Sequence, residues 1–401
     1  MSADKVEDRG AVEDEKERRL RRSLKQKIKK KDKPLTWRKR KEQHKPEKEE
    51  KLLNQLKEFK NYKEPTESVE NNTIEDDGVE EVVEKKKSSK LSTQGRRYTV
   101  SIALPGSIMD NAQSAELRTY LAGQIARAAA VFCVDEIIIF DEHAKITRND
   151  IDAFDRGQWP QPGAMDKPGD CNFLLARILQ YLECPQYLRK ALFPLQRQLQ
   201  YAGLLNPLDA MHHLRHDDLS IPYREAVVLN KPVKEGRGSF CDAGLAKEVQ
   251  VDRSLEAGIR VTLKLTSTDM MKRNLRADVV SPSEPRKKGG IYWGYSVRVA
   301  SSLGGVFKDG PYEYDMLMGT SERGESIDEV EVPNFKHGLI VFGGLNGLEA
   351  CLDADQSLSA DNPADLFQLY INSLPDQGSH TIRTEEAILI TLGALRPKFI
   401  G

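Results

Sequence analysis

Three glycine-bearing segments follow strand-like runs within about the last hundred residues of the chain. They are GTSERG (Gly319–Gly324), FGGLNG (Phe342–Gly347) and SLPDQGSHTIRTEEA (Ser373–Ala387). Glycine after a strand permits positive φ angles and lets backbone approach a ligand closely. Because ligands of open α/β sheets bind outside the carboxyl ends of the strands, we expect the three segments to converge on one pocket. Taken alone, GGLNG is as well explained by a tight turn, and a dinucleotide-binding GxGxxG would follow the first strand instead.

Several charged residues lie near these segments, and Arg298 is the most informative of them. It interrupts an otherwise apolar run, YSVRVASSL, which indicates a mostly buried strand. Burying an unpaired cation is costly. Arg298 therefore either pairs with an acid such as Glu322 or points into the ligand crevice, and we favour the crevice. Arg383 could likewise serve the pocket, or pair with Glu322 or Glu386 as a brace.

Histidine and cysteine residues offer a second kind of chemistry, which the pattern does not favour. In MHHLRH, His212 and His216 are four residues apart, but no cysteine or acid accompanies them at metal-ligand spacing. We prefer a solvated hinge here and expect no metal site. The five cysteines are scattered without a CxxC pair, which favours a reducing, intracellular setting over a disulfide or zinc framework. Cys133 and Cys184 are expected to be small core residues.

Charge distribution divides the chain more clearly than composition does. The 401 residues include 61 basic and 62 acidic side chains, for a net charge of −1. Lys and Arg dominate residues 15–41, and acids dominate residues 64–84. Such blocks bury too little apolar surface to offset the entropy of ordering, so we expect residues 1–95 to form a disordered arm. The chain has neither an apolar run of about 18 residues nor a secretory leader, which predicts a soluble protein that does not enter a membrane.

The elements that must position the glycine segments begin after this arm. Residues 96–218 show an α/β pattern, with the following expected elements: strands at 98–107 and 136–142, a helix whose inner face carries Leu117, Leu121, Ile125, Ala128 and Phe132, a mobile loop at 143–170, a helix at 172–193 and a strand at 199–208. The pattern resumes in residues 289–401. It continues through residues 292–303, 315–324 and 339–350, and then a strand is expected at 366–374 and a helix at 381–395.

Residues 219–288 interrupt the α/β pattern with short β-like segments and little helical periodicity. That change indicates a small inserted β-barrel or sandwich. OB-like barrels bind single-stranded nucleic acid through aromatic and basic side chains. The candidates in this unit are Tyr223, Phe240, Lys231, Lys234, Arg237 and Lys247. With so few aromatic residues, the unit could equally be a spacer or a protein-docking module.

The glycine segments and the final helix together resemble the trefoil-knot motifs of SPOUT methyltransferases. The strand-turn-helix order in FGGLNGLEA and SLPDQGSHTIRTEEAILITLGAL carries this resemblance. With ALPGSIMDNAQSAELRTYLAGQIARAA, ARILQYLECPQYLRKALFP, LQYAGLLNPLDAMHHLR and GTSERG, it narrows to a eukaryotic and archaeal subfamily with an OB-like insert. The resemblance covers roughly residues 97–397. It implies an α/β SPOUT fold with a C-terminal trefoil knot, a rare exception to the rule that chains do not knot.

The resemblance also implies a homodimer that binds S-adenosylmethionine in the knot and methylates RNA. In eukaryotic relatives the acceptor is a uridine N3 of large-subunit ribosomal RNA. By matching position, the residues that would bind the donor are Thr320, Ser321, Gly343, Gly344, Gly347, Asn372, Gln377, Gly378, Thr381, Ile382 and Arg383.

The catalytic residues are expected among the charged side chains near this set. A uridine N3 must lose a proton as it accepts the methyl group, which a base and an oxyanion-stabilising cation would assist. Glu322 is the candidate base, and Arg298 or Arg323 is the candidate stabiliser.

The basic arm suggests phosphate contact and nuclear or nucleolar targeting. A cytoplasmic or spindle-associated pool is compatible with the same arm. The rival function is a degenerate knot that acts as an RNA-binding or scaffold module in the nucleus or at the mitotic spindle. Three converging backbone pockets favour the enzyme, since a scaffold does not need them.

Overall fold

The computed structural model describes residues 95–159, 170–234, 236–266, 275–311 and 313–399. The expected disordered arm, residues 1–94, and the centre of the expected mobile loop, residues 160–169, lie outside these ranges. No helix among the described residues is both long enough and apolar enough to span a bilayer.

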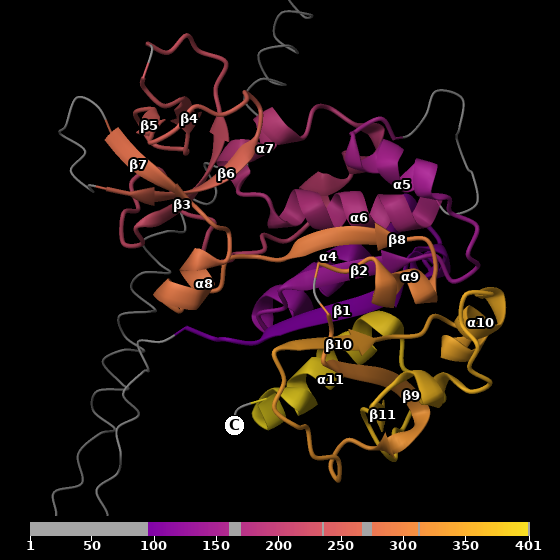
Figure 1. The fold of residues 1–401 in the computed structure, drawn as a ribbon. Coiled ribbons are helices and arrows are strands. Elements are labelled where there is room, and N and C mark those ends of the chain that lie inside the picture. Colours follow the sequence, from indigo (N-terminus) through magenta and orange to yellow (C-terminus); the bar gives the residue numbers. More distant parts are fainter. Residues whose placement is uncertain (1–94, 160–169, 235, 267–274, 312, 400–401) are drawn as a thin grey trace, which may run out of the picture. The chain divides into compact units, whose positions relative to one another are not determined.

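A six-stranded parallel sheet forms the centre of the described structure (Figure 1). Its strands are β1 (Thr99–Pro105), β2 (Glu136–Phe140), β8 (Ser296–Ala300), β9 (Met316–Ser326), β10 (His337–Val341) and β11 (Leu369–Asn372). They are arranged in the order β11-β9-β10-β1-β2-β8, and every neighbouring pair is parallel. All carboxyl ends therefore lie along one edge, which brings together the segments that follow β9, β10 and β11.

Helices cover both faces of this sheet. The helices that pack with the sheet are α4 (Ala115–Val131), α5 (Arg148–Asp155), α6 (Asp170–Glu183), α9 (Leu303–Lys308), α10 (Gly347–Ala354) and α11 (Thr384–Leu395). Two others, α7 (Gln186–Leu192) and α8 (Glu284–Gly289), contact the inserted residues 223–264 instead. Ile102 and Ile137 pack with α4, α6 and α11, whereas their neighbours Ala103 and Ile138 pack with α9 and α10. Alternate residues of each strand point to opposite faces, so these continuously apolar strands are buried on both sides.

Four expectations about local structure are corrected. Pro185 interrupts the expected 172–193 helix, which divides into α6 and α7. Residues 199–208 form no strand but two 3₁₀ turns, η2 (Arg197–Leu199) and η3 (Ala202–Leu204), because the sheet ends at β8. The expected mobile loop contains α5, which Thr147 and Asp150 cap reciprocally. The last helix begins at Thr384 rather than residue 381.

A closed five-stranded barrel interrupts the sheet in sequence, within the expected 219–288 insert. Its strands are β3 (Tyr223–Val228), β4 (Phe240–Asp242), β5 (Val249–Val251), β6 (Arg260–Leu265) and β7 (Leu275–Val280). They follow one another in the order β3-β4-β5-β7-β6. Pairing of β3 with β6 closes the barrel, and β5 and β7 form its parallel pair. A five-stranded Greek-key barrel of this kind is the OB-like fold that the sequence predicts.

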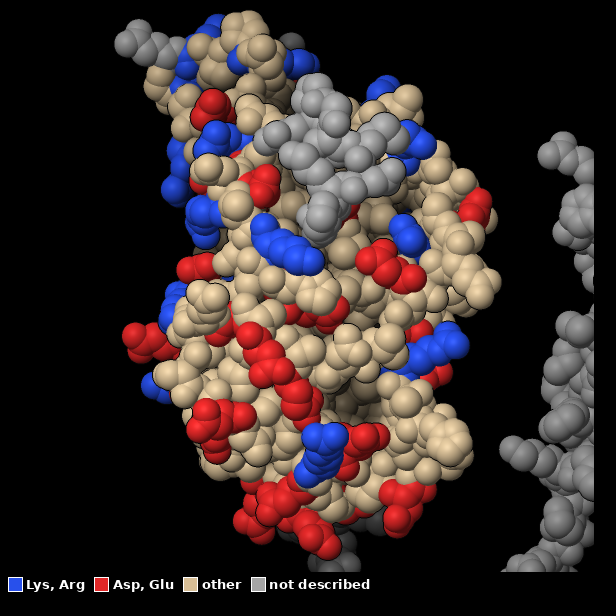
Figure 2. Space-filling model, turned by 90° about the vertical axis from the view of Figure 1, so that its right-hand side faces the viewer, with Lys and Arg blue, Asp and Glu red and all other residues tan. Residues whose placement is uncertain are grey.

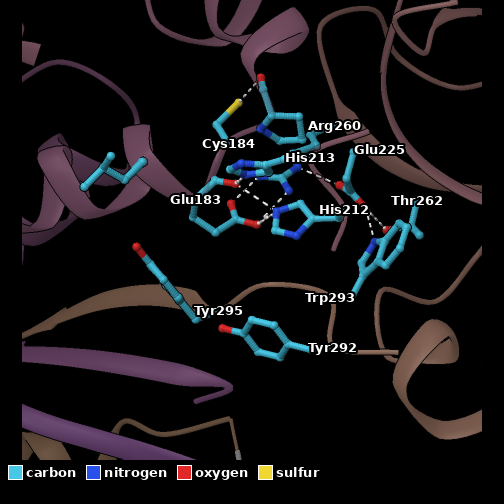
Figure 3. Close-up of polar contacts among 12 residues, drawn as sticks. Glu183, Cys184, His212, His213, Glu225, Arg260, Thr262, Tyr292, Trp293 and Tyr295 are labelled. Carbon is cyan, nitrogen blue, oxygen red and sulfur yellow. Dashed lines mark hydrogen bonds and ion pairs between the residues drawn. The ribbon is translucent and has the colours of Figure 1, made fainter. Parts of the chain in front are cut away.

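A buried ionic network joins this barrel to the end of α6 (Figure 3). Arg260 of β6 contacts both carboxylate oxygens of Glu183, with Nη1–Oε2 at 2.6 Å and Nη2–Oε1 at 3.0 Å. The same guanidinium donates from Nε to Glu225 of β3 at 2.6 Å. Glu225 also accepts from the Trp293 indole at 2.7 Å. The network thus couples four segments that are far apart in sequence.

Two histidines of MHHLRH, His212 and His213, belong to this network and do not form the expected solvated hinge. His212 is fully buried, and its Nε2 lies 3.0 Å from Glu183 Oε1. His213 contacts the Glu183 carbonyl oxygen at 2.7 Å, and burial together with His212 lowers the pKa of His213 to about 4. His216 is exposed beside Asp217. The two histidines with metal-ligand spacing therefore do not face a common site.

Replacing Glu183 by Gln should lower the free energy of unfolding by about 3 kcal/mol at neutral pH, because it leaves Arg260 with a single buried anion. Burial raises the pKa of Glu183, but the contacts with Arg260 and His212 outweigh it and hold that pKa well below its ordinary value of 4.5. This stabilisation is complete above pH 4.5 and is lost as the pH falls through the folded-state pKa. The difference in the free energy of unfolding between the native protein and the Glu183→Gln variant should therefore narrow below pH 4.5.

Urea unfolding of both proteins across this pH range measures the effect. The exposed Glu256, which lies in a turn of the barrel, provides the matched control. Glu256→Gln should change stability by less than about 0.5 kcal/mol. Equal stability of the Glu183→Gln variant and the native protein at pH 7 would show that the network contributes nothing.

Candidate functional site

A cavity of about 1010 Å³ opens at the carboxyl ends of β9, β10 and β11. Four segments line it: part of β9, the turn between β10 and α10, the segment that follows β11, and the loop and helix around residues 111–124. It brings together most of the residues expected from sequence: Thr320, Ser321, Gly343, Gly344, Gly347, Asn372, Gln377, Thr381, Ile382, Arg383, Glu322 and Arg323.

The first wall of the cavity is a strand rather than the expected turn. β9 runs through GTSERG, but its pairing with β11 shifts abruptly: Gly319 is opposite Tyr370, and Glu325 is opposite Ile371. Residues 320–324 therefore arch away from the ladder. The Asn372 amide holds this arch by donating to the Glu322 carbonyl oxygen at 3.0 Å.

The glycine turn between β10 and α10 forms the second wall. Gly347 has a φ of +72°, and a Cβ at Gly343 would lie 2.9 Å from the Gly347 carbonyl carbon. A side chain at either position would therefore strain or open the turn. The Thr384 hydroxyl donates to the Gly343 carbonyl oxygen at 3.0 Å, which ties the start of α11 to this turn. Backbone thus forms this part of the cavity.

The third wall follows β11, and Gly378 departs from the expectation there. A Cβ at Gly378 would meet no atom within 4 Å, and its φ is not in the left-handed region. Gly378 is also not among the residues that line the cavity. A side chain at Gly378 would therefore cause no strain. Asp376, with a φ of +56°, is the residue that turns the chain here.

The charged side chains of the cavity do not make it basic. Two arginines line it, against three glutamates: Arg323 and Arg383, with Glu322, Glu349 and Glu385. Glu322 and Arg323 are exposed, and Arg323 Nη1 lies 3.3 Å from Glu349 Oε1. Arg383 contacts Glu386 through its backbone N–H, at 3.0 Å. The contact between Arg383 and Glu386 is therefore a hydrogen bond from the Arg383 backbone.

Arg298 lies outside the cavity, contrary to our preference for the crevice. It is on β8, at the opposite edge of the sheet from β9 and β11. Its Nε donates to Glu136 Oε1 at 3.0 Å, and Nη2 donates to the Val306 carbonyl oxygen at 2.7 Å. The Tyr314 hydroxyl donates to the other Glu136 oxygen at 2.7 Å. The ion-pair alternative is therefore the one that the structure shows, with Glu136 in place of Glu322 as the partner of Arg298.

Sequence reasoning missed the fourth wall, which comes from α4 and the residues before it. Asn111, Gln113, Tyr120 and Gln124 line this side together with Leu117. Leu117 was expected on the buried face of the helix, but it is 53% exposed. The spacing of Leu117 along α4 places it near the edge of the buried face of the helix. A leucine at the edge of an apolar stripe gives no signal that separates a core position from a cavity wall.

A parallel sheet with a backbone-walled cavity at its carboxyl edge and an inserted barrel defines a class of α/β ligand-binding proteins. The family model described as "Putative RNA methyltransferase" matches residues 99–395, which include the sheet, the barrel and all four walls of the cavity. The chain belongs to this RNA methyltransferase family. The membership confirms the resemblance seen in the sequence motifs.

Curated relatives agree with this assignment. The chain is 51% identical over 334 residues to the 28S rRNA (uridine-N(3))-methyltransferase of Homo sapiens, covering 82% of this chain and 86% of the relative. It is 53% identical to the protein of the same name from Mus musculus, covering 77% and 79% of the two chains. The Drosophila melanogaster protein of that name is 51% identical, with 75% of this chain and 62% of the relative covered.

Arg298→Ala should destabilise the protein by about 3 kcal/mol, because it leaves the Glu136 carboxylate buried without its cation. Methyl transfer by the folded fraction should stay unchanged, since Arg298 does not reach the cavity. Chemical denaturation and single-turnover rates of the same preparation measure the two effects. Arg148→Ala, which removes an exposed arginine, is the control and should cost less than about 1 kcal/mol. An Arg298→Ala variant that is as stable as the native protein but transfers methyl groups slowly would show that Arg298 is catalytic after all.

Proposed function

We propose that this protein transfers a methyl group from S-adenosylmethionine to the N3 atom of a uridine in large-subunit ribosomal RNA. The observation that carries the proposal is the convergence of three glycine-bearing segments on one cavity in a member of an RNA methyltransferase family. The names of the human, mouse and fly relatives support the choice of acceptor.

The residues of the cavity fit such a donor. Pockets for ligands of this size measure about 300–1,000 Å³, so a volume of about 1010 Å³ holds the donor and leaves room for part of an acceptor base. The glycine turn of residues 343–347 exposes backbone groups that suit adenine and ribose. Thr320, Ser321, Asn372, Gln377, Thr381 and Ile382 would complete the donor site.

The donor supplies a methyl group already activated by its positive sulfonium, so the protein has mainly to orient the acceptor in line with it. Glu322 is positioned to accept the N3 proton of the uridine, because it is exposed on the arch of β9 at the cavity. Arg323 and Arg383 would stabilise the negative charge that develops on the uracil oxygens.

The final segment of the chain supports the proposal of a trefoil knot. Residues 327–336 connect β9 to β10, and this connection touches the chain on both sides of α11. The Ile327 N–H donates to the Asn372 carbonyl oxygen at 3.0 Å, before α11. The Lys398 ammonium donates to the Val330 carbonyl oxygen at 2.9 Å, after α11. A passage of α11 beneath this connection would give both contacts.

An exposed apolar face on α4 and α11 supports a homodimer. Tyr120, Val131 and Leu389 are each about half exposed and line a depression of about 270 Å³ between the two helices. Tyr120 also lines the larger cavity. A second copy of this chain on that face would bury these side chains and close one side of the cavity.

Localisation in the nucleus, with accumulation in the nucleolus, follows from the substrate and from the basic arm. Ribosomal RNA is transcribed and modified there, and Lys- and Arg-rich runs such as KQKIKKKDK are typical of nuclear targeting. We further propose residues 219–288 as an independent inserted domain between the two parts of the methyltransferase domain, 96–218 and 289–401.

Gly343→Ala should abolish binding of S-adenosylmethionine, because its Cβ would displace the backbone of the glycine turn that lines the cavity. Calorimetry with S-adenosylmethionine or its demethylated product measures the affinity. Gly378→Ala is the matched control and should bind as the native protein does, since open space surrounds that position. Native affinity in a folded Gly343→Ala variant would place the donor elsewhere.

Leu389→Glu should convert the homodimer to a monomer, because it places a charge on the apolar face. Light scattering after size-exclusion chromatography measures the mass. The control is Leu195→Glu, which makes the same change at a fully exposed leucine outside this face. A native protein that is monomeric at micromolar concentration would contradict the proposal.

A further inference from the structure

The donor cavity lacks the positive charge that an RNA substrate requires. RNA affinity depends on neutralising phosphates with Lys and Arg, yet the cavity lining carries more glutamates than arginines. Figure 2 shows Asp and Glu gathered over the lower half of one face, and Lys and Arg over its upper left. Most of the phosphate contacts must therefore be made away from the cavity.

The outer face of the barrel carries a row of side chains suited to RNA. Phe240 of β4 is opposite Gln250 of β5, and Gln250 is opposite Arg276 of β7. Their neighbours Cys241 and Val249 point inward to the barrel core. Because alternate residues of a strand face opposite sides, Phe240, Gln250 and Arg276 lie side by side on the outer surface.

Phe240 and Arg276 are available to a partner, whereas the Gln250 amide donates to the Gly238 carbonyl oxygen at 3.1 Å. Phe240 is only half-buried, and Arg276 is exposed. No acidic side chain among the described residues forms an ion pair with Arg276. The adjoining β3–β4 loop adds two further exposed cations, Lys234 and Arg237. A ring beside several unneutralised cations is the combination that single-stranded nucleic acid requires.

Acidic residues limit the path of a strand over this face. Asp252 and Asp278 follow the row along β5 and β7. Asp252 is partly neutralised, because its carboxylate contacts Arg253 at 2.8 Å and accepts from the Val279 N–H at 2.9 Å. The end of the β3–β4 loop lies at the same end of the barrel as these acids, because the Ser239 N–H donates to the Arg253 carbonyl oxygen at 3.0 Å. A strand that runs from the row to Lys234 and Arg237 therefore passes beside Asp252, whose charge is offset in part by Arg253.

The opposite side of the barrel serves the interior of the protein. Tyr223 of β3, the other aromatic residue expected to contact RNA, is 4% exposed and packs against Trp293. Arg260 of β6 contacts Glu183 at the end of α6, and Glu225 of β3 accepts from the Trp293 indole. The barrel is thus attached through β3 and β6, which leaves the row on β4, β5 and β7 free.

We propose that the row Phe240–Gln250–Arg276, with the β3–β4 loop, binds a single-stranded segment of the RNA substrate. One base stacks on Phe240, and Arg276, Lys234 and Arg237 contact the phosphates. This inference rests on the proposed function, for which it supplies a second RNA contact outside the cavity. Binding by strands two and three and the first loop is common in five-stranded barrels of this kind.

The test compares Phe240→Leu with Phe240→Trp in the full chain. Leucine keeps the apolar volume but cannot stack, whereas tryptophan stacks more strongly. Fluorescence anisotropy with a labelled single-stranded RNA that contains uridine should show about tenfold weaker binding for Phe240→Leu and undiminished binding for Phe240→Trp. Arg276→Glu should also bind weakly and flatten the slope of log affinity against log salt by at least about 0.7. Lys308→Glu, a charge reversal at the exposed end of α9, should bind as the native protein does.

Donor affinity and methyl transfer separate the failure of this inference from that of the proposed function. The barrel variants should keep native melting temperatures, native affinity for S-adenosylmethionine and native kcat, and raise only KM for RNA. Native RNA affinity in both Phe240→Leu and Arg276→Glu would overturn the inference while leaving the methyltransferase intact. A native protein that binds neither RNA nor donor would overturn both.

Discussion

The parallel pairing of β9, β10 and β11 is the constraint on which the site depends. It places three carboxyl ends at one edge, so three segments that are separate in sequence meet there. The five-residue register shift between β9 and β11 then creates an arch where a regular ladder would leave a flat edge. Backbone therefore forms much of the cavity, and substitution at Gly343 or Gly347 disturbs it more than substitution of a charged residue at its rim.

Much of the site could be predicted because its signals are local. A glycine after an apolar run by itself indicates a turn with a close backbone approach or a positive φ, and Thr320, Gly343 and Asn372 indeed line one cavity. Arg298 could not be placed in this way, because its partner Glu136 lies on a strand that neighbours it only in the folded sheet. The wall from α4 was missed for a similar reason: Leu117 is apolar whether it faces core or cavity. At Gly378 the sequence indicated a requirement for glycine that the structure does not have. A glycine in open space cannot be distinguished, from sequence alone, from one that a tight turn requires.

Buried ionic contacts attach the barrel, whereas backbone forms much of the cavity. Glu183, Glu225 and Arg260 satisfy one another with hydrogen bonds from His212, Thr262 and Trp293. Ionic contacts of this kind have strict geometry, whereas apolar contacts allow sliding. The barrel is therefore held in one orientation, as a second RNA-binding surface at a set distance from the cavity would require.

The pairing of β1 with β10 has a consequence for how the chain reaches this structure. Thr99 and His337, which share a hydrogen bond, are 238 residues apart, and the whole barrel lies between them. Barrel strands have partners much nearer in sequence, and loop-closure entropy favours such short-range contacts. During synthesis the barrel is complete while one edge of β1 still awaits its neighbour. That unpaired and largely apolar strand is a stretch of the folding chain exposed to aggregation.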